Sequence, residues 1–390
     1  MIRSFRYQIK PTKAQERTLL TWLELTRELY NGALEDRRDR WSRFKLKTHV
    51  FDQIRQLPGV KNVRPEFAEI PSVVLRGPLD RIDKAFKNFF TRCKKGDTPG
   101  YPRFKSAKRW NTITIDDLER ARVGKLFVAG GSRIAVPVLG KVKIRMHRPI
   151  EGKPKTMRII RSCGRWYVRF ACVDVQPRPL PKTGRDVGID MGLSQFVATS
   201  DGEIFTNPRP LRAAKIGLAR ALRRIHRRKC GGKRWRQAAD LVGKKHAHIA
   251  NVRRENHIHV ANALVSRYDT VFVESLTIKG LSNGTLAKSF RDAAFGNFLR
   301  WLREKAENAS RAVVEVDPRF TSQTCPQCGT VAKKSLSQRV HDCPCGLIGD
   351  RDVVAAQVIL KLGRSLQGAA APVRAQRRSA KIKSVSTTGA

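Results

Sequence analysis

The order of short apolar strands and longer helical segments after Gly184 constrains the fold more than any other feature of the sequence. Three strands come first, and helix, strand, helix, strand and helix then follow. Strands separated by helices favour an α/β domain in which helices pack on a sheet. The expected strands are Asp186–Leu193, Gln195–Thr199, Glu203–Phe205, Thr270–Val273 and Ala312–Val316, and the expected helical segments are Leu211–Tyr268, Ala293–Asn308 and Val353–Leu362.

Single acidic residues accompany three of these apolar elements. Asp190 lies inside the strand sequence GIDMGL, Glu274 ends the strand in TVFVESL, and Asp352 lies at the start of the last helix. A carboxylate in such a setting loses water, so it needs a cation or hydrogen bonds to remain charged. The element order is that of the ribonuclease H-like fold. Three such acids suit a site for two Mg²⁺ ions, which can assist an in-line displacement at phosphorus by water.

The sequence Asp350-Arg351-Asp352 offers two candidates for the last acid. An Asp just before a helix most often caps it by accepting hydrogen bonds from the first free N–H groups. Asp350 suits that role better than Asp352, so Asp352 is the expected metal ligand. If all of the acids were caps or strand-edge residues, the chain would carry no such metal site.

Four cysteines form two closely spaced pairs just before the last helix. Two residues separate Cys325 from Cys328, and only Pro344 separates Cys343 from Cys345. Pairs of this kind, flanked by Pro and Gly, predict a zinc ribbon whose four thiolates leave no open coordination position. His341 is an alternative ligand if the tight second pair cannot bring both thiolates to the metal. The remaining cysteines are isolated and are interpreted as core or surface residues.

A helical stretch interrupts a series of strands in the first 183 residues. Ile2–Ile9 alternates like a strand, and Thr12-x-x-Gln15 is the pattern of a capping box that opens a helix. Helices are expected from there to about Lys105. The later strands predict a small barrel or sandwich that Ile2–Ile9 joins. These strands are Thr112–Ile115, Lys125–Val128, Arg133–Val136, Lys141–Met146, Thr156–Arg161 and Trp166–Val173.

Positive charge dominates the composition, with 79 Lys and Arg against 33 Asp and Glu, a formal net charge of +46. Nucleic acid is the expected partner, because Lys and Arg neutralise phosphates; an anionic membrane is the weaker alternative. Residues 209–236 contain twelve Lys or Arg and no acid, which indicates a track for phosphates. The residues expected to bind are Arg220, Arg223, Arg224, Arg227 and Arg228. Without a signal-peptide pattern or an apolar run of membrane length, the cytoplasm, near the nucleoid, is the expected location.

Together these motifs resemble the TnpB family, proteins encoded by insertion sequences and related to compact type V CRISPR effectors. The resemblance spans nearly the whole chain. The motifs that carry it are Arg6-Tyr7, Pro11-Thr12-x-x-Gln15, Tyr30-Asn31, GYPRFK (Gly100–Lys105), GIDMGL, VESL, PRFTSQTCPQCG (Pro318–Gly329) and CGLIGDRDVVAA (Cys345–Ala356).

The resemblance implies an RNA-guided DNA endonuclease with a wedge barrel, a helical recognition insert and a RuvC-type nuclease domain that carries a zinc ribbon. A transposon-derived guide RNA would pair with the target strand, and the protein would read a short motif beside the target. Asp190, Glu274 and Asp352 correspond to the catalytic acids of the family. Val354 occupies a position where the family usually has Asn.

These observations predict seven segments and leave two other functions open. A guided DNA-binding protein without cleavage and a transposase acting directly on DNA ends are the alternatives. The predicted segments are the first barrel strand (1–10), the helical insert (11–105), the remaining barrel and linker (106–183), the nuclease core (184–320), the zinc ribbon (321–347), the last nuclease segment (348–363) and a disordered basic tail (364–390).

Overall fold

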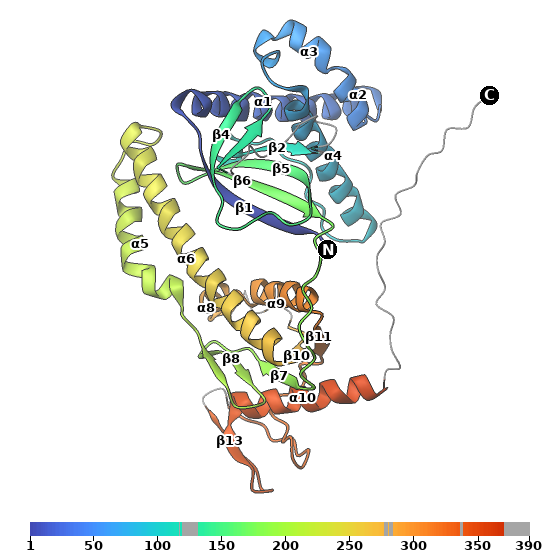
Figure 1. Cartoon of the computed structure of the whole chain (residues 1–390), viewed down its shortest axis with the longest axis vertical. Helices are drawn as coiled ribbons and strands as arrows, with labels where there is room; N and C mark the ends of the chain where they lie inside the picture. Colours follow the sequence, from blue (N-terminus) through green and yellow to red (C-terminus); the bar gives the residue numbers. More distant parts are fainter. Residues whose placement is uncertain (117, 119–131, 277–279, 281–283, 336–337, 370–390) are drawn as a thin grey trace, which may run out of the picture. The chain divides into compact units, whose positions relative to one another are not determined.

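The computed structural model describes residues 1–116, 118, 132–276, 280, 284–335 and 338–369 (Figure 1). The predicted strand Lys125–Val128 and the tail from 370 to 390 lie outside the described residues. The chain divides into two compact units, one formed by residues 1–177 and 217–247 and the other by residues 178–216 and those from 248 onward. Within the described ranges, no helix is both long and apolar enough to cross a membrane.

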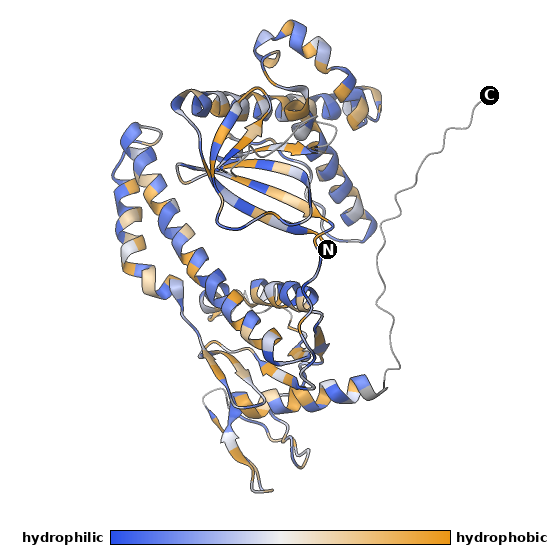
Figure 2. Cartoon of the chain, viewed as in Figure 1, coloured by the Kyte–Doolittle hydropathy of each residue, from blue (hydrophilic) through white to orange (hydrophobic). Residues whose placement is uncertain are grey.

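The first unit is built on six antiparallel strands that curl into a half-barrel in the order β2-β5-β6-β1-β4-β3 (Figure 1). Buried and exposed residues alternate along these strands, and Figure 2 shows the alternation as stripes of hydropathy. β1 pairs with β4 and β6, as predicted, while β2 and β3 are the edges of the described sheet, which is therefore not a closed barrel. The strands are β1 (Arg3–Lys10), β2 (Thr112–Asp116), β3 (Arg133–Val136), β4 (Gly140–Arg145), β5 (Lys153–Ser162) and β6 (Arg165–Val173).

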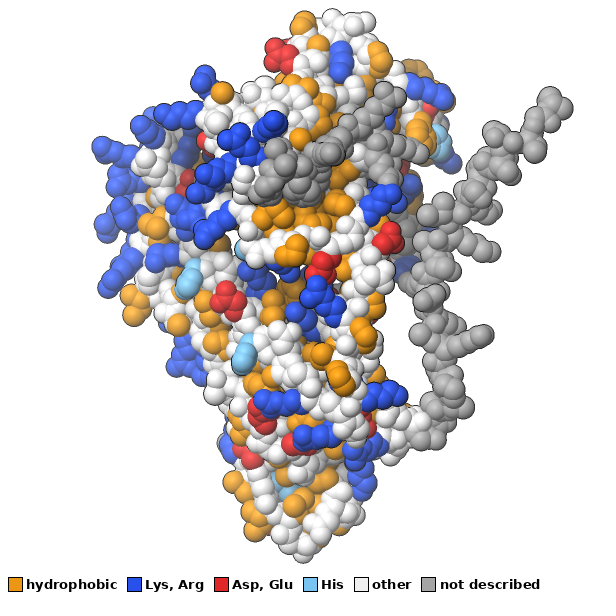
Figure 3. Space-filling model, in the orientation of Figure 1, with side chains coloured by type: hydrophobic (Ala, Val, Ile, Leu, Met, Phe, Trp, Pro, Cys, Tyr) orange, Lys and Arg blue, Asp and Glu red, His pale blue; other side chains and the backbone are white. Residues whose placement is uncertain are grey.

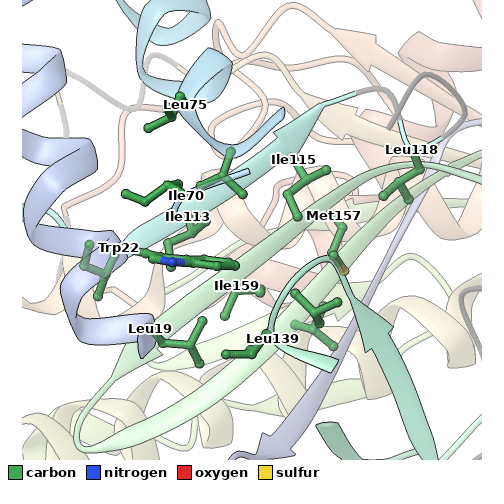
Figure 4. Close-up of a cluster of buried hydrophobic side chains, with 14 of the residues drawn as sticks. Leu19, Trp22, Ile70, Leu75, Ile113, Ile115, Leu118, Leu139, Met157 and Ile159 are labelled. Carbon is green, nitrogen blue, oxygen red and sulfur yellow. The ribbon is translucent and has the colours of Figure 1, made fainter. Parts of the chain in front are cut away.

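Helices between β1 and β2 pack on this sheet. Leu19 and Trp22 of the first helix lie with Ile113 of β2 and Ile159 of β5 in one buried cluster (Figure 4). Burying each of these side chains contributes about 1.5–3 kcal/mol to folding. The helices are α1 (Lys13–Phe44), α2 (Val50–Arg55), α3 (Leu57–Val63) and α4 (Ser72–Lys94), with short 3-10 turns at Pro65–Phe67 and Ala107–Arg109.

Side-chain hydrogen bonds fix both the start of α1 and the loop that follows α4. The predicted capping box is confirmed, because Thr12 Oγ1 accepts from the Gln15 N–H and Gln15 Oε1 accepts from the Thr12 N–H. Asn31, further along α1, donates to the Lys105 carbonyl at 3.0 Å and accepts from the Lys105 N–H at 2.8 Å. Two family motifs, Tyr30-Asn31 and GYPRFK, are thus parts of one contact.

The second unit contains a five-stranded sheet in the order β11-β10-β7-β8-β9. β7, β10 and β11 are parallel, and β8 and β9 continue the sheet as an antiparallel meander. The order of strands along the chain that the sequence predicts is confirmed. The strands are β7 (Asp186–Asp190), β8 (Gln195–Thr199), β9 (Ile204–Thr206), β10 (Thr270–Glu274) and β11 (Ala312–Val316).

One predicted helical segment is divided into two helices, and another begins two residues later than predicted. The segment Leu211–Tyr268 consists of α5 (Pro210–His226) and α6 (Lys233–Arg267), and the turn between them contains Gly231 with a positive φ. The helix predicted from Ala293 begins instead as α9 (Phe295–Ala309), because Ala294 has a left-handed φ of 52° and separates it from α8 (Ala287–Ala293).

The last helix, α10 (Arg351–Ala369), lies directly against the sheet. A Cβ atom on Gly188 of β7 would collide with the backbone of α10 at Ala356 and Leu360, and one on Gly363 would collide with the ring of Phe272. Because Gly188 and Gly363 have no side chain, α10 can approach the sheet this closely. The helix continues to Ala369, so residues 364–369, predicted as part of a disordered tail, are helical.

Candidate active site

Asp190 and Glu274 end two neighbouring parallel strands. The register pairs Ile189 of β7 with Val273 of β10, so the next residue on each strand is one of the two acids. The carboxyl ends of parallel strands meet at one edge of a sheet, where open α/β sheets bind their ligands. The strand pairing thus brings together two acids that are 84 residues apart in the sequence.

Asp352 joins these acids from the first turn of α10. Its side chain is only 8% exposed, and its Oδ2 atom lies 3.7 Å from the point where a Cβ atom on Gly192 would be. Gly192 follows Asp190 by two residues, so this distance places the Asp352 carboxylate close to the carboxyl end of β7. The structure therefore groups the three sequence-predicted acids at the carboxyl end of β7.

Burial shifts Asp190 and Glu274 away from their ionised forms. Loss of water around Asp190, together with the charges of Glu274 and Asp352, raises the pKa of Asp190 to about 8. Burial also raises the pKa of Glu274, although a hydrogen bond from Thr321 opposes that shift. Such a cluster of negative charge favours a bound cation. The donor set, three carboxylates, fits Mg²⁺.

In buffer free of divalent cations, we expect Asp190 to lower the stability of the protein as the pH rises from about 4 to about 8. The unfolded chain releases the Asp190 proton near pH 4, whereas the folded state retains it to about 8. Folding therefore takes up a proton in this range, and the free energy of unfolding falls as pH rises. Asp190→Asn should remove this contribution and raise the thermal midpoint at the alkaline end. Thermal unfolding of both proteins across the range checks this, and an identical pH dependence would contradict it.

Asp350 has the structural role that the sequence predicts for it. Its Oδ1 atom accepts hydrogen bonds from the N–H groups of Asp352, at 2.8 Å, and Val353, at 3.3 Å. These are the free donors at the start of α10, so Asp350 caps the helix. Asp352, two residues later, is left to take part in the acid cluster.

Thr321 is a site residue that the sequence did not identify. Its buried hydroxyl lies within hydrogen-bonding reach of both Glu274 Oε1 and the Pro318 carbonyl oxygen. The hydrogen bond to Glu274 orients that carboxylate and partly offsets the rise in its pKa that burial causes. Thr321 and Glu274 are 47 residues apart, and nothing in the local pattern of either points to the other.

Cys325, Cys328, Cys343 and Cys345 form one cluster next to the acid site in sequence. Their sulfur atoms all lie within 4.8 Å of one another. Each pair sits on a tight turn, in which the N–H of Gly329 or Gly346 donates to the carbonyl of the first cysteine of its pair. Hydrogen bonds from Thr330 lower the pKa of Cys328 to about 6, which favours a thiolate. The cluster has the donor set of a structural zinc site.

His341 is not part of this cluster. It lies on β12 (Val340–Asp342), which forms a hairpin with β13 (Ile348–Asp350), and its Nδ1 atom contacts the ammonium group of Lys334. Both Cys343 and Cys345 reach the other thiols, so the close spacing of the second pair does not require a histidine in place of a thiolate.

Hydrogen bonds connect the cysteine segment to the start of α10. The Arg351 guanidinium donates to the carbonyls of Gln338, at 2.9 Å, and Ser335, at 3.3 Å, and the Arg351 N–H donates to the carbonyl of Arg339. Arg351 precedes Asp352, and Thr321 contacts Glu274 from the start of the same segment. The cysteine segment therefore supports two of the three acids.

The basic segment around α5 presents its charges to solvent. The five arginines predicted to bind nucleic acid are exposed, and none forms an ion pair with a carboxylate of the described residues: Arg220, Arg223, Arg224, Arg227 and Arg228. Lys and Arg side chains gather over this part of the molecule in Figure 3. Such unpaired charge favours binding to phosphates.

Three protein-family profiles match the chain. One described as "Helix-turn-helix domain" matches residues 1–45, and one described as "Probable transposase" matches residues 170–284. A third, "Cas12f1-like, TNB domain", matches residues 295–359, which include the cysteine cluster.

Two similar proteins are each named "Putative RNA-guided DNA endonuclease". The one from Streptomyces pristinaespiralis is 34% identical over 97% of this chain and 94% of its own length. The one from Escherichia coli K12 is 26% identical over 94% of this chain and 93% of its own. A solved structure titled as the mini-RNA-guided endonuclease CRISPR-Cas phi3 aligns with 93% of this chain and 92% of its own at 11% identity and a TM-score of 0.49.

Proposed function

The chain belongs to the TnpB family. On that premise we propose that it is an RNA-guided DNA endonuclease whose catalytic residues are Asp190, Glu274 and Asp352. The observation that carries the proposal is the grouping of three desolvated carboxylates at one sheet edge. The strand order of the second unit supports a ribonuclease H-like, RuvC-type domain around them.

The proposed reaction is hydrolysis of a DNA phosphodiester. Water forms a new bond to phosphorus, the bond to the 3′ oxygen breaks, and that oxygen takes a proton and leaves as a 3′ hydroxyl. Two Mg²⁺ ions, when bound, would supply positive charge to the phosphate and the attacking water. Asp190, Glu274 and Asp352 would hold these ions. Thr321 orients Glu274.

We assign the partners from the same premise. A transposon-derived guide RNA would select the target by base pairing, and the protein would read a short motif beside it. The arginines around α5 would neutralise nucleic-acid phosphates. The four thiolates would hold a structural zinc ion that keeps Thr321 and Arg351 in place.

Cleavage of a plasmid library tests the proposal. The protein is purified with its native transcript and incubated with Mg²⁺ and plasmids that carry the guide-matched target beside randomised flanks. We expect cleavage of a subset of flanks and none with Asp190→Ala. Cleavage that survives this substitution would contradict the assigned site.

The sequence departure at Val354 bears on the alternative of guided binding without cleavage. Val354 is 3% exposed, and one of its methyl groups lies 3.3 Å from the point where a Cβ atom on Gly349 would be. Its side chain thus fills a packed position at the start of α10, and the sequence retains all three acids. Binding without cleavage by the parent protein would favour the alternative.

Thr321→Val should lower the cleavage rate about tenfold and raise the Mg²⁺ concentration needed for half-maximal rate. The substitution keeps the side-chain shape but removes the hydroxyl that orients Glu274. Thr321→Ser should retain most of the activity. Thr324→Val, in the same segment, is a matched control, because among the described residues the Thr324 hydroxyl donates only to the Phe320 carbonyl. Equal effects of the two valine variants would refute the positioning role.

A further inference from the structure

An aromatic cluster lies partly exposed at the end of α4 and on the loop that follows. The ring of Tyr101 packs against those of Phe86 and Phe89, with centroids 5.6 and 5.4 Å apart, and Phe90 extends the cluster. Within this cluster Phe90 is 56% exposed and Tyr101 44%, and Phe104, three residues further along the loop, is 47% exposed. Contiguous exposed apolar groups of this kind mark interaction sites.

The loop that carries Tyr101 and Phe104 is held in place. Asn31 exchanges two hydrogen bonds with the backbone of Lys105, as described above. Pro102 is buried, and the guanidinium of Arg38 on α1 lies 5.5 Å from the centroid of the Phe104 ring. The two exposed rings are therefore displayed from a fixed backbone, which lowers the entropy lost on binding.

Positive charge surrounds the rings. Residues 84–109 contain nine Lys or Arg and a single acid, Asp97. Burial lowers the pKa of Lys105, and the nearby charges of Arg81, Arg109 and Arg103 lower it further, with no carboxylate acting in the opposite direction. Cations that repel one another at a surface favour an anionic ligand.

We propose that the platform formed by Phe90, Tyr101, Arg103, Phe104 and Lys105 binds an unpaired stretch of the guide RNA. Bases would stack on the rings while Arg103 and Lys105 contact the phosphates, which is how proteins bind single strands without reading their sequence. The Tyr101 hydroxyl forms no hydrogen bond within the described part of the chain, so it is available to a ribose 2′-hydroxyl. That the RNA is the guide rests on the function proposed above.

Binding of a short fluorescent oligouridine to the full-length, RNA-free protein tests the platform. Anisotropy is measured at the salt concentration that abolishes binding of a duplex DNA of equal length, because stacking then outweighs charge. The double variant Tyr101→Leu with Phe104→Leu should bind at least about tenfold more weakly than the parent. The matched control, Tyr101→Phe with Phe104→Tyr, keeps two aromatic rings and should lose far less affinity than the leucine variant.

A second variant tests the phosphate contacts. Arg103→Gln with Lys105→Gln should reduce the slope of log affinity against log salt concentration by about 1.4, since each phosphate contact on a single strand contributes about 0.7. An unchanged slope would overturn the assignment of these two cations.

Three results would overturn the proposal. Parent-like RNA binding by the leucine variant would remove the stacking role, and an equal loss by the aromatic control would show that shape rather than stacking matters. Tighter binding of deoxythymidine than of uridine strands, lost in the leucine variant, would assign the platform to DNA. Guided cleavage by the parent is assayed separately, so a failure of this proposal is distinguishable from a failure of the nuclease assignment.

Discussion

We expect Asp352→Asn to reduce guided cleavage by about 10³-fold or more, and Asp350→Asn to leave it close to that of the parent. The first substitution removes a carboxylate from the proposed metal site, where charge stabilisation amounts to several kcal/mol. The second keeps the side-chain oxygen that accepts from the N–H groups of Asp352 and Val353, and Asn caps helices as well as Asp does. Two like substitutions on one turn should thus differ by orders of magnitude.

Single-turnover cleavage of a matched target measures this difference. Guide RNA binding and thermal midpoint, recorded for each variant, should remain near those of the parent. Equal loss of cleavage in both variants would show that the start of α10, rather than the Asp352 carboxylate, is what cleavage requires. Parent-like cleavage by Asp352→Asn would refute the three-acid site itself.

We expect Cys345→Ser to abolish stable zinc binding and to lower cleavage about 10- to 100-fold, while Cys230→Ser changes neither. Both cysteines are exposed, but only Cys345 lies in the four-thiol cluster. Loss of one thiolate leaves the metal site with three ligands. The cysteine segment, which contacts Glu274 through Thr321 and accepts hydrogen bonds from Arg351, is then no longer held together by the metal. Supports of metal ligands typically contribute 10- to 100-fold to activity, which sets the expected size.

Metal analysis of the purified proteins and the cleavage assay together check this prediction. One zinc ion per chain is expected for the parent and for Cys230→Ser. Retained zinc in Cys345→Ser that is then lost on adding His341→Ala would restore histidine as a ligand. Loss of zinc with full cleavage would show that the acids do not depend on the ribbon.

The acids and the cysteines could be predicted because each has a local signal. Asp190 lies within the apolar sequence GIDMGL, where a carboxylate is costly unless it has a partner. The cysteine pairs have the spacing of metal-binding turns. The order of strands around the acids was also predictable, since apolar strands are short and are separated by long helical segments.

Contacts between distant residues could not be predicted in this way. Thr321 reaches Glu274, and Asn31 reaches Lys105, only because tertiary packing brings their segments together. The break at Ala294 depends on a left-handed backbone that alanine adopts only under constraint from the surrounding fold. The extent to which the first sheet curls likewise depends on pairing between β1 and strands more than 100 residues away.

Packing at Gly188 and Gly363, rather than the length of the cysteine segment, determines where Asp352 lies. The close fit at these glycines, backbone against backbone and backbone against ring, gives α10 one register along the sheet. The helix therefore places Asp352 beside Asp190 however many residues lie between β11 and β13. The segment between β11 and β13 can therefore change in length or sequence during evolution while the acids keep their spacing. Gly188 and Gly363, although they carry no side chain, therefore fix the position of an acid in the proposed nuclease site.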